Sequence, residues 1–496
     1  MKRTLFIIPA LIIFTLLAFL PAISGDNYLN SFDGGIHNMI LTQNAALTSG
    51  IGVYEASAGI GVTTLRPSPA SIYWNPAGLG FLKRGGILLE AVPGFSYSPD
   101  VSQDIKTETD KNLQENFQLN HPVYGPSIIV YPDFTFEGGQ KSQAVSALAL
   151  AVPYRNFFLG FAYYQAYALN VNLISAGLEN LITSLEDDPA DNATIFTRTD
   201  INLLLDLKAD AYAFSCGKSI SKTSALGLTV TRLNASTTIN GLLAPEGVFT
   251  RRGIEKSFNN PAEGYNNDFY SSMIGSFDGG AWGIKAGFAY HPSANLSVDL
   301  VYSHYGDLTL DGEMEIIQYF YPAMNLNADE AAGEETFNIN NIENFAQPTE
   351  TVAADNEPGD QMTINLPSSI SFGLAFRRIS FSLTKYTGEL SYSLDLARDG
   401  IPATYSRGLK PNTGFLLGFD FKYIRLSFGG ITGEEVISGY KDKDGVPIEP
   451  TTGIIIPRFS LGTGFRINQD WKMDILLLSM PDLFGSVLKL GATYTF

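Results

Sequence analysis

The feature that most constrains this chain is an alternation of apolar with small or polar residues, at a period of two, that recurs along most of its length. Between Ile284 and Tyr290, one face carries Ile, Ala, Phe and Tyr, and the other carries Lys285 and Gly287. Beyond residue 25 no run of 18 apolar residues occurs, so no transmembrane helix is expected there. If the chain crosses a membrane, it must do so as a closed β-barrel, because only helices and closed barrels satisfy every backbone polar group in lipid.

Period-two alternation also fits a soluble β-sandwich, so other features must separate the two folds. The apolar face is rich in Phe and Tyr, as the lipid-facing band of a membrane barrel is. Charged residues make up only 17% of the chain, and 48 residues are glycine. Soluble domains usually carry ~25% charged residues. This composition favours a barrel with one strand face toward lipid and the other toward a filled lumen.

The alternating segments predict fourteen strands, joined alternately by long and short connections. We expect strands near 86–97, 143–154, 156–168, 199–217, 223–242, 281–291, 295–316, 363–376, 379–397, 412–422, 424–437, 453–467, 471–478 and 486–496. Outer-membrane barrels have an even strand number, short periplasmic turns and long outer loops. A soluble sandwich has no reason to place its long loops at one end. The predicted fold is therefore all-β, a 14-stranded antiparallel transmembrane β-barrel over 86–496 in a bacterial outer membrane.

Both ends of the chain carry features of an exported barrel. Lys2 and Arg3 precede an apolar run, and small residues follow it, which predicts a signal peptide over 1–24; an uncleaved membrane anchor is the alternative. The final alternating segment ends in Phe496, with Tyr494 two residues before it. An amphipathic last strand with a terminal Phe resembles the signal that the barrel assembly machinery reads, so we expect that machinery and outer-membrane lipid as partners.

Residues 25–85 are predicted to form a plug inside the barrel. This segment contains Ser71-Ile-Tyr73-Trp74-Asn75-Pro76-Ala77-Gly78-Leu79, in which proline and glycine favour a turn that starts a short helix. About 60 residues is small for an independent domain without disulfides or metals. A barrel lumen would support such a segment on all sides.

These residues resemble the "YNPAGL" hatch motif of the FadL/TodX-type transporters of long-chain fatty acids and other hydrophobic compounds. Two further stretches are similar to motifs of that family, at 283–299 and 365–376. The resemblance implies a fourteen-stranded barrel with an amino-terminal hatch formed around Tyr73, Trp74, Asn75, Pro76, Ala77 and Gly78. It also implies capture of hydrophobic molecules from outside, passage by the hatch, and a sideways exit near a kinked early strand, here 156–168.

In that family the third and fourth outer loops form a hydrophobic entry groove, which points to 243–280 and 317–362 in this chain. The candidate substrate-binding residues are Phe249, Phe258, Phe269, Tyr319 and Phe320, together with Arg251, Arg252 and Lys256 for a carboxylate. Exposed apolar clusters usually mark binding surfaces. The alternative is that these aromatic residues pack the loops against one another and that the basic residues are solvated.

The net charge of −18 argues against a nucleic-acid partner. The range 317–362 holds nine acidic residues and no Lys or Arg, and it would repel a fatty-acid anion at low salt. A neutral hydrophobic compound is therefore a second candidate substrate.

No motif for catalysis, a cofactor or a metal emerges. Ser382 and Lys385 match an S-x-x-K pattern, but they lie in an alternating segment rather than at a helix start. We expect no enzyme, no cofactor and no metal. The predicted function is passive transport of hydrophobic small molecules; the alternative is a surface scaffold, an adhesin or a porin-like barrel.

Overall fold

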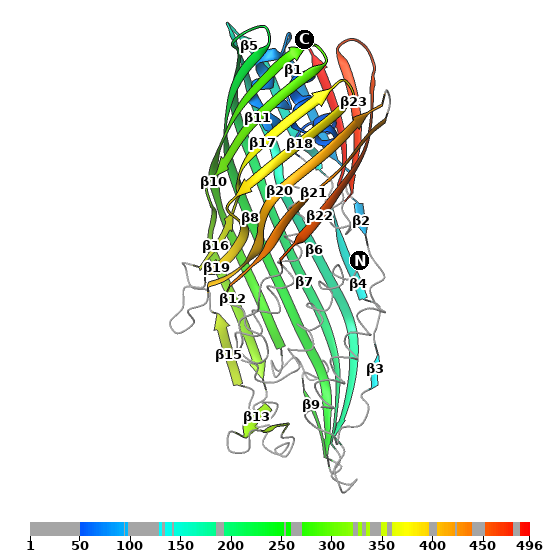
Figure 1. Cartoon of the computed structure of the whole chain (residues 1–496). Helices are drawn as coiled ribbons and strands as arrows, with labels where there is room; N and C mark the ends of the chain where they lie inside the picture. The colour runs from blue at the N-terminus through cyan, green and yellow to red at the C-terminus, as the bar shows by residue number, and fades with distance from the viewer. Residues whose placement is uncertain are drawn as a thin grey trace.

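The computed structural model is a closed antiparallel β-barrel of fourteen strands (Figure 1). The first wall strand, β1 (Gly86–Val92), pairs with the last, β24 (Val487–Thr495), which closes the sheet. The residues that the structure describes are 50–93, 95–97, 128–130, 134–140, 143–184, 193–251, 254–258, 270–320, 326–329, 334–337, 349–354, 360–395, 404–421, 424–438, 452–479 and 487–496. The predicted signal peptide, 1–24, lies outside them.

Around the wall, each strand pairs with its neighbours in the sequence, as the sequence predicted. After β1 the wall continues through β5 (Gln143–Tyr154), β6 (Phe157–Ser184), β7 (Ala193–Ser219), β8 (Ser224–Arg251) and β10 (Tyr270–Ser293). Three positions are each divided in two: β11 (Leu296–Tyr305) with β12 (Leu308–Phe320), β16 (Asp360–Asn365) with β17 (Ser368–Phe376), and β18 (Ile379–Thr387) with β19 (Leu390–Asp395). The rest are β20 (Thr404–Asp420), β21 (Ile424–Ser438), β22 (Ile454–Arg466), β23 (Trp471–Ser479) and β24.

Short turns gather at one end of the barrel, which we call the short-turn end. They lie at 155–156, 220–223, 294–295, 377–378 and 467–470. At the opposite end, which we call the long end, several wall strands run further and there are short additional strands (Figure 1). These are β2 (Phe95–Tyr97), β3 (Ile128–Val130), β4 (Phe134–Gln140), β9 (Ile254–Phe258), β13 (Leu326–Asp329), β14 (Glu334–Phe337) and β15 (Thr349–Ala354).

Side chains alternate between the two faces of the wall as the period-two pattern predicted. On β8, Leu226, Leu228 and Val230 are exposed on the outer face, whereas Thr229 and Thr231 are buried on the inner face. The outer face elsewhere is a band of exposed aliphatic and aromatic side chains that includes Phe161, Phe214, Trp282, Phe372 and Phe459. Such a band suits contact with lipid.

The expectation that 243–280 and 317–362 are loops was wrong for much of both ranges. Strand β8 runs on to Arg251 and turns back as β9, β10 begins at Tyr270, and β12 continues to Phe320. In the missed part of β10 the outer face is partly polar, with Ser276 and Asp278 both exposed, so the apolar alternation is weak there. A strand that rises above the apolar band no longer needs an apolar outer face.

Residues 50–82 lie inside the barrel near the short-turn end, where Figure 1 shows their helices enclosed by strands. They form α3 (Val53–Ala58), α4 (Ile60–Leu65), α5 (Ser71–Trp74) and the 3-10 helix η2 (Pro76–Phe81). Glycines with positive φ flank α3, Gly52 at 89° and Gly59 at 80°, a conformation that side chains with a Cβ rarely adopt. In the described part of the chain, no helix combines the length and apolarity needed to span a membrane.

A row of glycines on the inner wall makes room for the start of η2. Gly217, Gly227 and Gly287 lie opposite one another on β7, β8 and β10. A Cβ at Gly227 would lie 2.1 Å from the carbonyl carbon of Pro76, and one at Gly287 would lie 2.0 Å from Oδ1 of Asn75. The backbone of the turn therefore sits directly against the wall, where only glycine fits.

We predict that Gly227→Ala loosens the inner segment, because the added methyl group has no space and overpacking costs about 1–3 kcal/mol. Hydrogen exchange of residues 70–82 in the purified protein should become faster. Gly462→Ala is the matched control, since its Cβ would have no neighbour closer than 3.4 Å. Equal exchange in the two variants would contradict the close contact.

Candidate functional site

The inner segment is held to the wall by buried polar groups centred on Asp299. Its side chain is fully buried on β11 and accepts hydrogen bonds from Thr64 Oγ1 at 2.6 Å and Asn75 Nδ2 at 2.8 Å. The Asn75 side chain also accepts from the backbone N–H of Ala77 at 3.1 Å, and so caps η2. A buried carboxylate with several donors is stabilised, whereas an unpaired one would be costly. Asp299 thus fixes two separate parts of the segment, α4 and the turn before η2.

A cavity of about 260 Å³ lies in the lumen, bordered by the inner segment and the barrel wall. We call it the lumen cavity. Its lining is mainly apolar and aromatic, and it includes Tyr73 and Trp74 from α5 and Tyr164, Tyr305 and Tyr386 from the wall. Tyr73 packs edge-on against both Trp74 and Tyr164, with ring centroids 5.1 and 5.3 Å apart. The cavity therefore offers a rigid apolar surface with hydroxyl groups at its edge.

Two cations border the lumen cavity, and no Asp or Glu is among the described residues that line it. Lys285 Nζ lies 4.2 Å from the centroid of the Tyr73 ring and donates to the Tyr73 carbonyl. Arg458 Nη2 donates to the carbonyl of Ala56 at 2.8 Å, while its Nε is buried and has no hydrogen-bond partner among the described residues. Both positive charges are thus held by neutral acceptors, which leaves them available to an anion.

The lumen cavity reaches the wall at Gln165 and Ala166, where the pairing of β6 is interrupted. Pairing with β5 ends at Tyr164, and pairing with β4 begins at Asn170. Among the residues described there, none of 165–169 pairs with β4 or β5. On the other side of β6, the register with β7 shifts between Gln165 and Tyr167. The wall next to the cavity is therefore less fully paired than an uninterrupted ladder would be.

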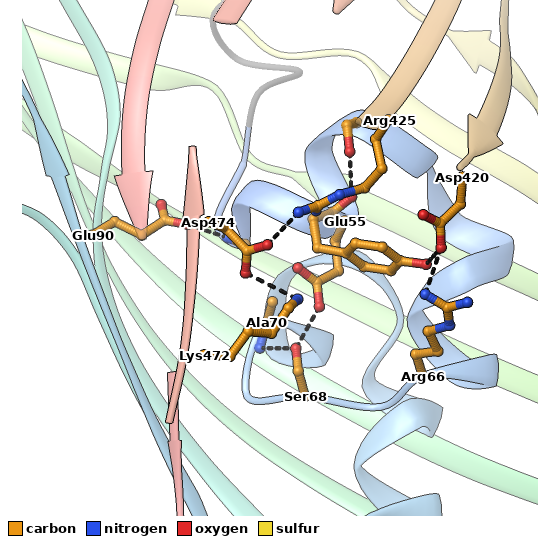
Figure 2. Close-up of polar contacts among 12 residues, drawn as sticks. Glu55, Arg66, Ser68, Ala70, Glu90, Asp420, Arg425, Lys472 and Asp474 are labelled. Atoms are coloured by element: carbon orange, nitrogen blue, oxygen red, sulfur yellow. Dashed lines mark hydrogen bonds and ion pairs between the residues drawn. The ribbon is translucent and has the colours of Figure 1, made fainter. Parts of the chain in front are cut away.

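A second cavity, of about 680 Å³, opens at the short-turn end, and we call it the short-turn cavity. Its lining holds a network of charged groups (Figure 2). Asp474 pairs with Arg425 and, at 2.9 Å, with Lys472. Asp420 accepts from the Tyr54 hydroxyl at 3.0 Å and pairs with Arg66. The network joins α3 to strands β20, β21 and β23.

Glu55, on α3, is buried beside this network and accepts a hydrogen bond from Ser68 Oγ at 2.6 Å. Burial raises the pKa of Glu55 above its ordinary value of 4.5, because the carboxylate loses its hydration. The positive charge of Lys472 and the Ser68 hydrogen bond offset part of that rise.

The structure separates the predicted hatch residues into two groups. Tyr73 and Trp74 line the lumen cavity. Asn75, Pro76, Ala77 and Gly78 are buried against the wall or the segment itself, where they hold the turn rather than face a ligand.

The predicted groove residues lie on the extensions at the long end. Phe249 and Arg251 are on β8, Lys256 and Phe258 are on β9, and Tyr319 and Phe320 are on β12. Phe249 is opposite Lys256 in the β8–β9 ladder, and Tyr319 is opposite Tyr270. Arg252 and Phe269 lie outside the described residues. A substrate role for this set stays a prediction.

Sequence reasoning did not select Lys285 or Arg458 as ligand-binding residues. The available signal was a basic residue on the inner face of an alternating strand, which is present at Lys285. Their common position at one cavity depends on how β10 and β22 face each other across the lumen. In the described part of the chain, no cluster of three or more His, Cys, Asp and Glu residues is arranged to hold a metal ion.

No protein-family model and no curated protein matches the sequence. Among solved structures, the toluene transporter TbuX of Ralstonia pickettii is 10% identical, with a TM-score of 0.41 over 90% of this chain and 98% of that chain. A FadL homologue of Pseudomonas aeruginosa is 13% identical, with a TM-score of 0.42 over 89% and 98%. The toluene transporter TodX of Pseudomonas putida is 10% identical, with a TM-score of 0.41 over 90% and 98%. The chain is similar to these structures in its arrangement of strands.

The raised pKa of Glu55 makes the hold on the inner segment dependent on pH. While the segment is in place, Glu55 binds its proton more tightly than after release, so the free energy of local opening falls as pH rises from about 4.5 through the raised pKa. Hydrogen exchange of residues 52–70, followed across this range, should accelerate with pH beyond the intrinsic chemical rate. Glu55→Gln should remove this extra dependence. The same dependence in that variant would assign it to another group.

Proposed function

We propose that this chain lets hydrophobic molecules with a carboxylate group, such as fatty acids, cross a bacterial outer membrane by passive transport. The observation that carries the proposal is the lumen cavity, which combines an aromatic lining with two cations and no lining acid in the described residues. A neutral hydrocarbon would need only the apolar part. The two cations favour an amphipathic anion, because a carboxylate would complete the hydrogen bonding of Arg458.

The size of the lumen cavity sets what it holds. Pockets that enclose drug-sized ligands measure roughly 300–1,000 Å³, and the lumen cavity is about 260 Å³. It therefore suits a medium-chain acid, or the head-group end of a longer chain. The carboxylate would lie between Lys285 and Arg458, and the acyl chain would lie against Tyr73, Trp74 and Tyr164.

We also propose the path around this cavity. Residues 25–85 act as the hatch, and substrate enters from the long end over Phe249, Phe258, Phe269, Tyr319 and Phe320 with help from Arg251, Arg252 and Lys256. The interruption in β6 supports a sideways exit into the membrane, because unpaired backbone there can separate at lower cost than a continuous ladder. This exit lies within the range 156–168 at its end near Gln165.

The cavity favours transport over the alternative of a surface scaffold, since a scaffold has no need for an aromatic lumen site with unopposed cations. Short turns on the inner side of the membrane are typical of outer-membrane barrels. We therefore propose that the short-turn end faces the periplasm.

Replacing the two cavity cations should weaken binding of a carboxylate and spare a neutral analogue. We predict that Arg458→Gln lowers the affinity of the purified protein for octanoate roughly 10- to 100-fold, the usual value of a charge-assisted hydrogen bond. Lys285→Gln should have an effect in the same direction. Affinity for octanol should change little in either variant. Arg378→Gln, at an exposed turn, is the matched control. Equal losses for acid and alcohol would remove the carboxylate assignment.

Closing the interruption in β6 should block release without blocking binding. The side chains of Gln143 and Gln165 hydrogen bond across it. In a Cys216→Ser background, Gln143→Cys with Gln165→Cys can be joined by a short thiol cross-linker. We predict that transfer of bound octanoate to lipid vesicles slows by at least about tenfold, because opening of the wall becomes limiting. Affinity should be unchanged, and the uncross-linked variant should transfer at the normal rate. Unimpeded transfer after cross-linking would exclude this exit.

A further inference from the structure

The short-turn cavity is separate from the lumen cavity, because no residue lines both. Helix α3 lies between them. Val53, Tyr54 and Glu55 line the short-turn cavity, whereas Gly59 and Ile60, just after α3, line the lumen cavity. One short helix therefore has a cavity on each side.

An arginine approaches α3 from each of these sides. On the lumen side, Arg458 donates to the carbonyl of Ala56 at 2.8 Å. On the short-turn side, the guanidinium of Arg425 lies 4.6 Å from the centroid of the Tyr54 ring. Within the part of the chain that the structure describes, each arginine also has one buried nitrogen without a hydrogen-bond partner, Nε in Arg458 and Nη1 in Arg425. Arg425 is only 4% exposed, and it borders the short-turn cavity.

We propose that the short-turn cavity is a second binding site for the same class of ligand, an amphipathic carboxylate. This inference rests on the proposed function, because it gives one ligand two successive sites on either side of α3. The second site would receive the ligand at the periplasmic end of the barrel.

The charges around the short-turn cavity support an anionic ligand. Its basic side chains are Arg66, Arg84, Arg425, Arg466 and Lys472, and its acidic ones are Glu55, Asp420, Asp470 and Asp474. Arg425 and Lys472 share Asp474, while Arg66 pairs with Asp420 and Arg84 pairs with Asp470. Glu55 is hydrogen bonded to Ser68, and among the described residues it forms no ion pair with a cation. A ligand carboxylate would supply a second negative charge to Arg425 and Lys472, which share the one carboxylate of Asp474.

The lining also offers a place for a hydrocarbon chain. Val53 from α3, Leu82 after η2 and Leu88 from β1 border the cavity, together with Pro67 and Pro69. An apolar side facing a guanidinium is what an amphipathic acid requires, since the chain is removed from water while its carboxylate keeps a charged partner. A small inorganic anion would use only the basic part.

Arg425 can be tested because its removal leaves the network paired. Asp474 keeps Lys472 at 2.9 Å in Arg425→Gln, so no buried carboxylate is left without a cation. The full chain in lipid nanodiscs would be titrated with radiolabelled octanoate, and empty nanodiscs would correct for partitioning. We expect two equivalents bound by the unaltered protein, one by Arg425→Gln, one by Arg458→Gln and two by the control Arg378→Gln.

The outcomes separate this inference from the proposed function. One equivalent in the unaltered protein, lost in Arg458→Gln and kept in Arg425→Gln, overturns the second site and leaves the lumen site standing. No octanoate bound overturns both. If Arg425→Gln does not fold, crystals of the unaltered protein with 8-bromooctanoate decide the question. An anomalous bromine peak in the short-turn cavity supports the site, and a peak only in the lumen cavity overturns it.

Discussion

The buried carboxylate of Asp299 is the contact on which the interior of this barrel depends. A wall of fourteen strands encloses more space than its own side chains fill, and in this barrel residues 50–82 occupy part of that space. Asp299 joins both Thr64 and Asn75 to the wall, and the glycine row lets the turn at Pro76 lie flat beside them. The two cavities are the spaces that the segment, held in this way, leaves on either side of α3.

The groups that contact the buried basic side chains differ between the two cavities on either side of α3. At the short-turn end, basic groups pair with Asp420, Asp470 and Asp474, and Arg425 and Lys472 share the one carboxylate of Asp474. In the lumen cavity, Lys285 and Arg458 are held by backbone carbonyls and aromatic faces instead. Such an arrangement adds little to stability, because a carbonyl compensates a buried cation less well than a carboxylate does. It is better explained by a ligand that brings the negative charge.

The sequence was enough to predict the wall, and it was not enough to predict the site. Alternation identified β23 and β24, because each strand must present an apolar face to lipid. It failed between 243 and 280, since strands above the apolar band no longer show that face. It could not place Lys285 and Arg458 at one cavity, because these residues lie on β10 and β22, which are distant in the sequence. The motif at Tyr73 was visible, but its division into cavity-lining and wall-packing residues required the glycine row.

The acidic character of the chain argues against an anionic substrate, but among the described residues no acid lines the lumen cavity itself. On β12, the exposed Asp311 and Glu313 lie on the outer face, since they alternate with Leu310 and Met314, which are buried on the inner face. At physiological salt, exposed charges are screened beyond about 8 Å. An anion inside the lumen is therefore governed by the groups that border its own cavity. There the described charges are both positive, so the net charge of the protein and the charge preference of its lumen have opposite signs.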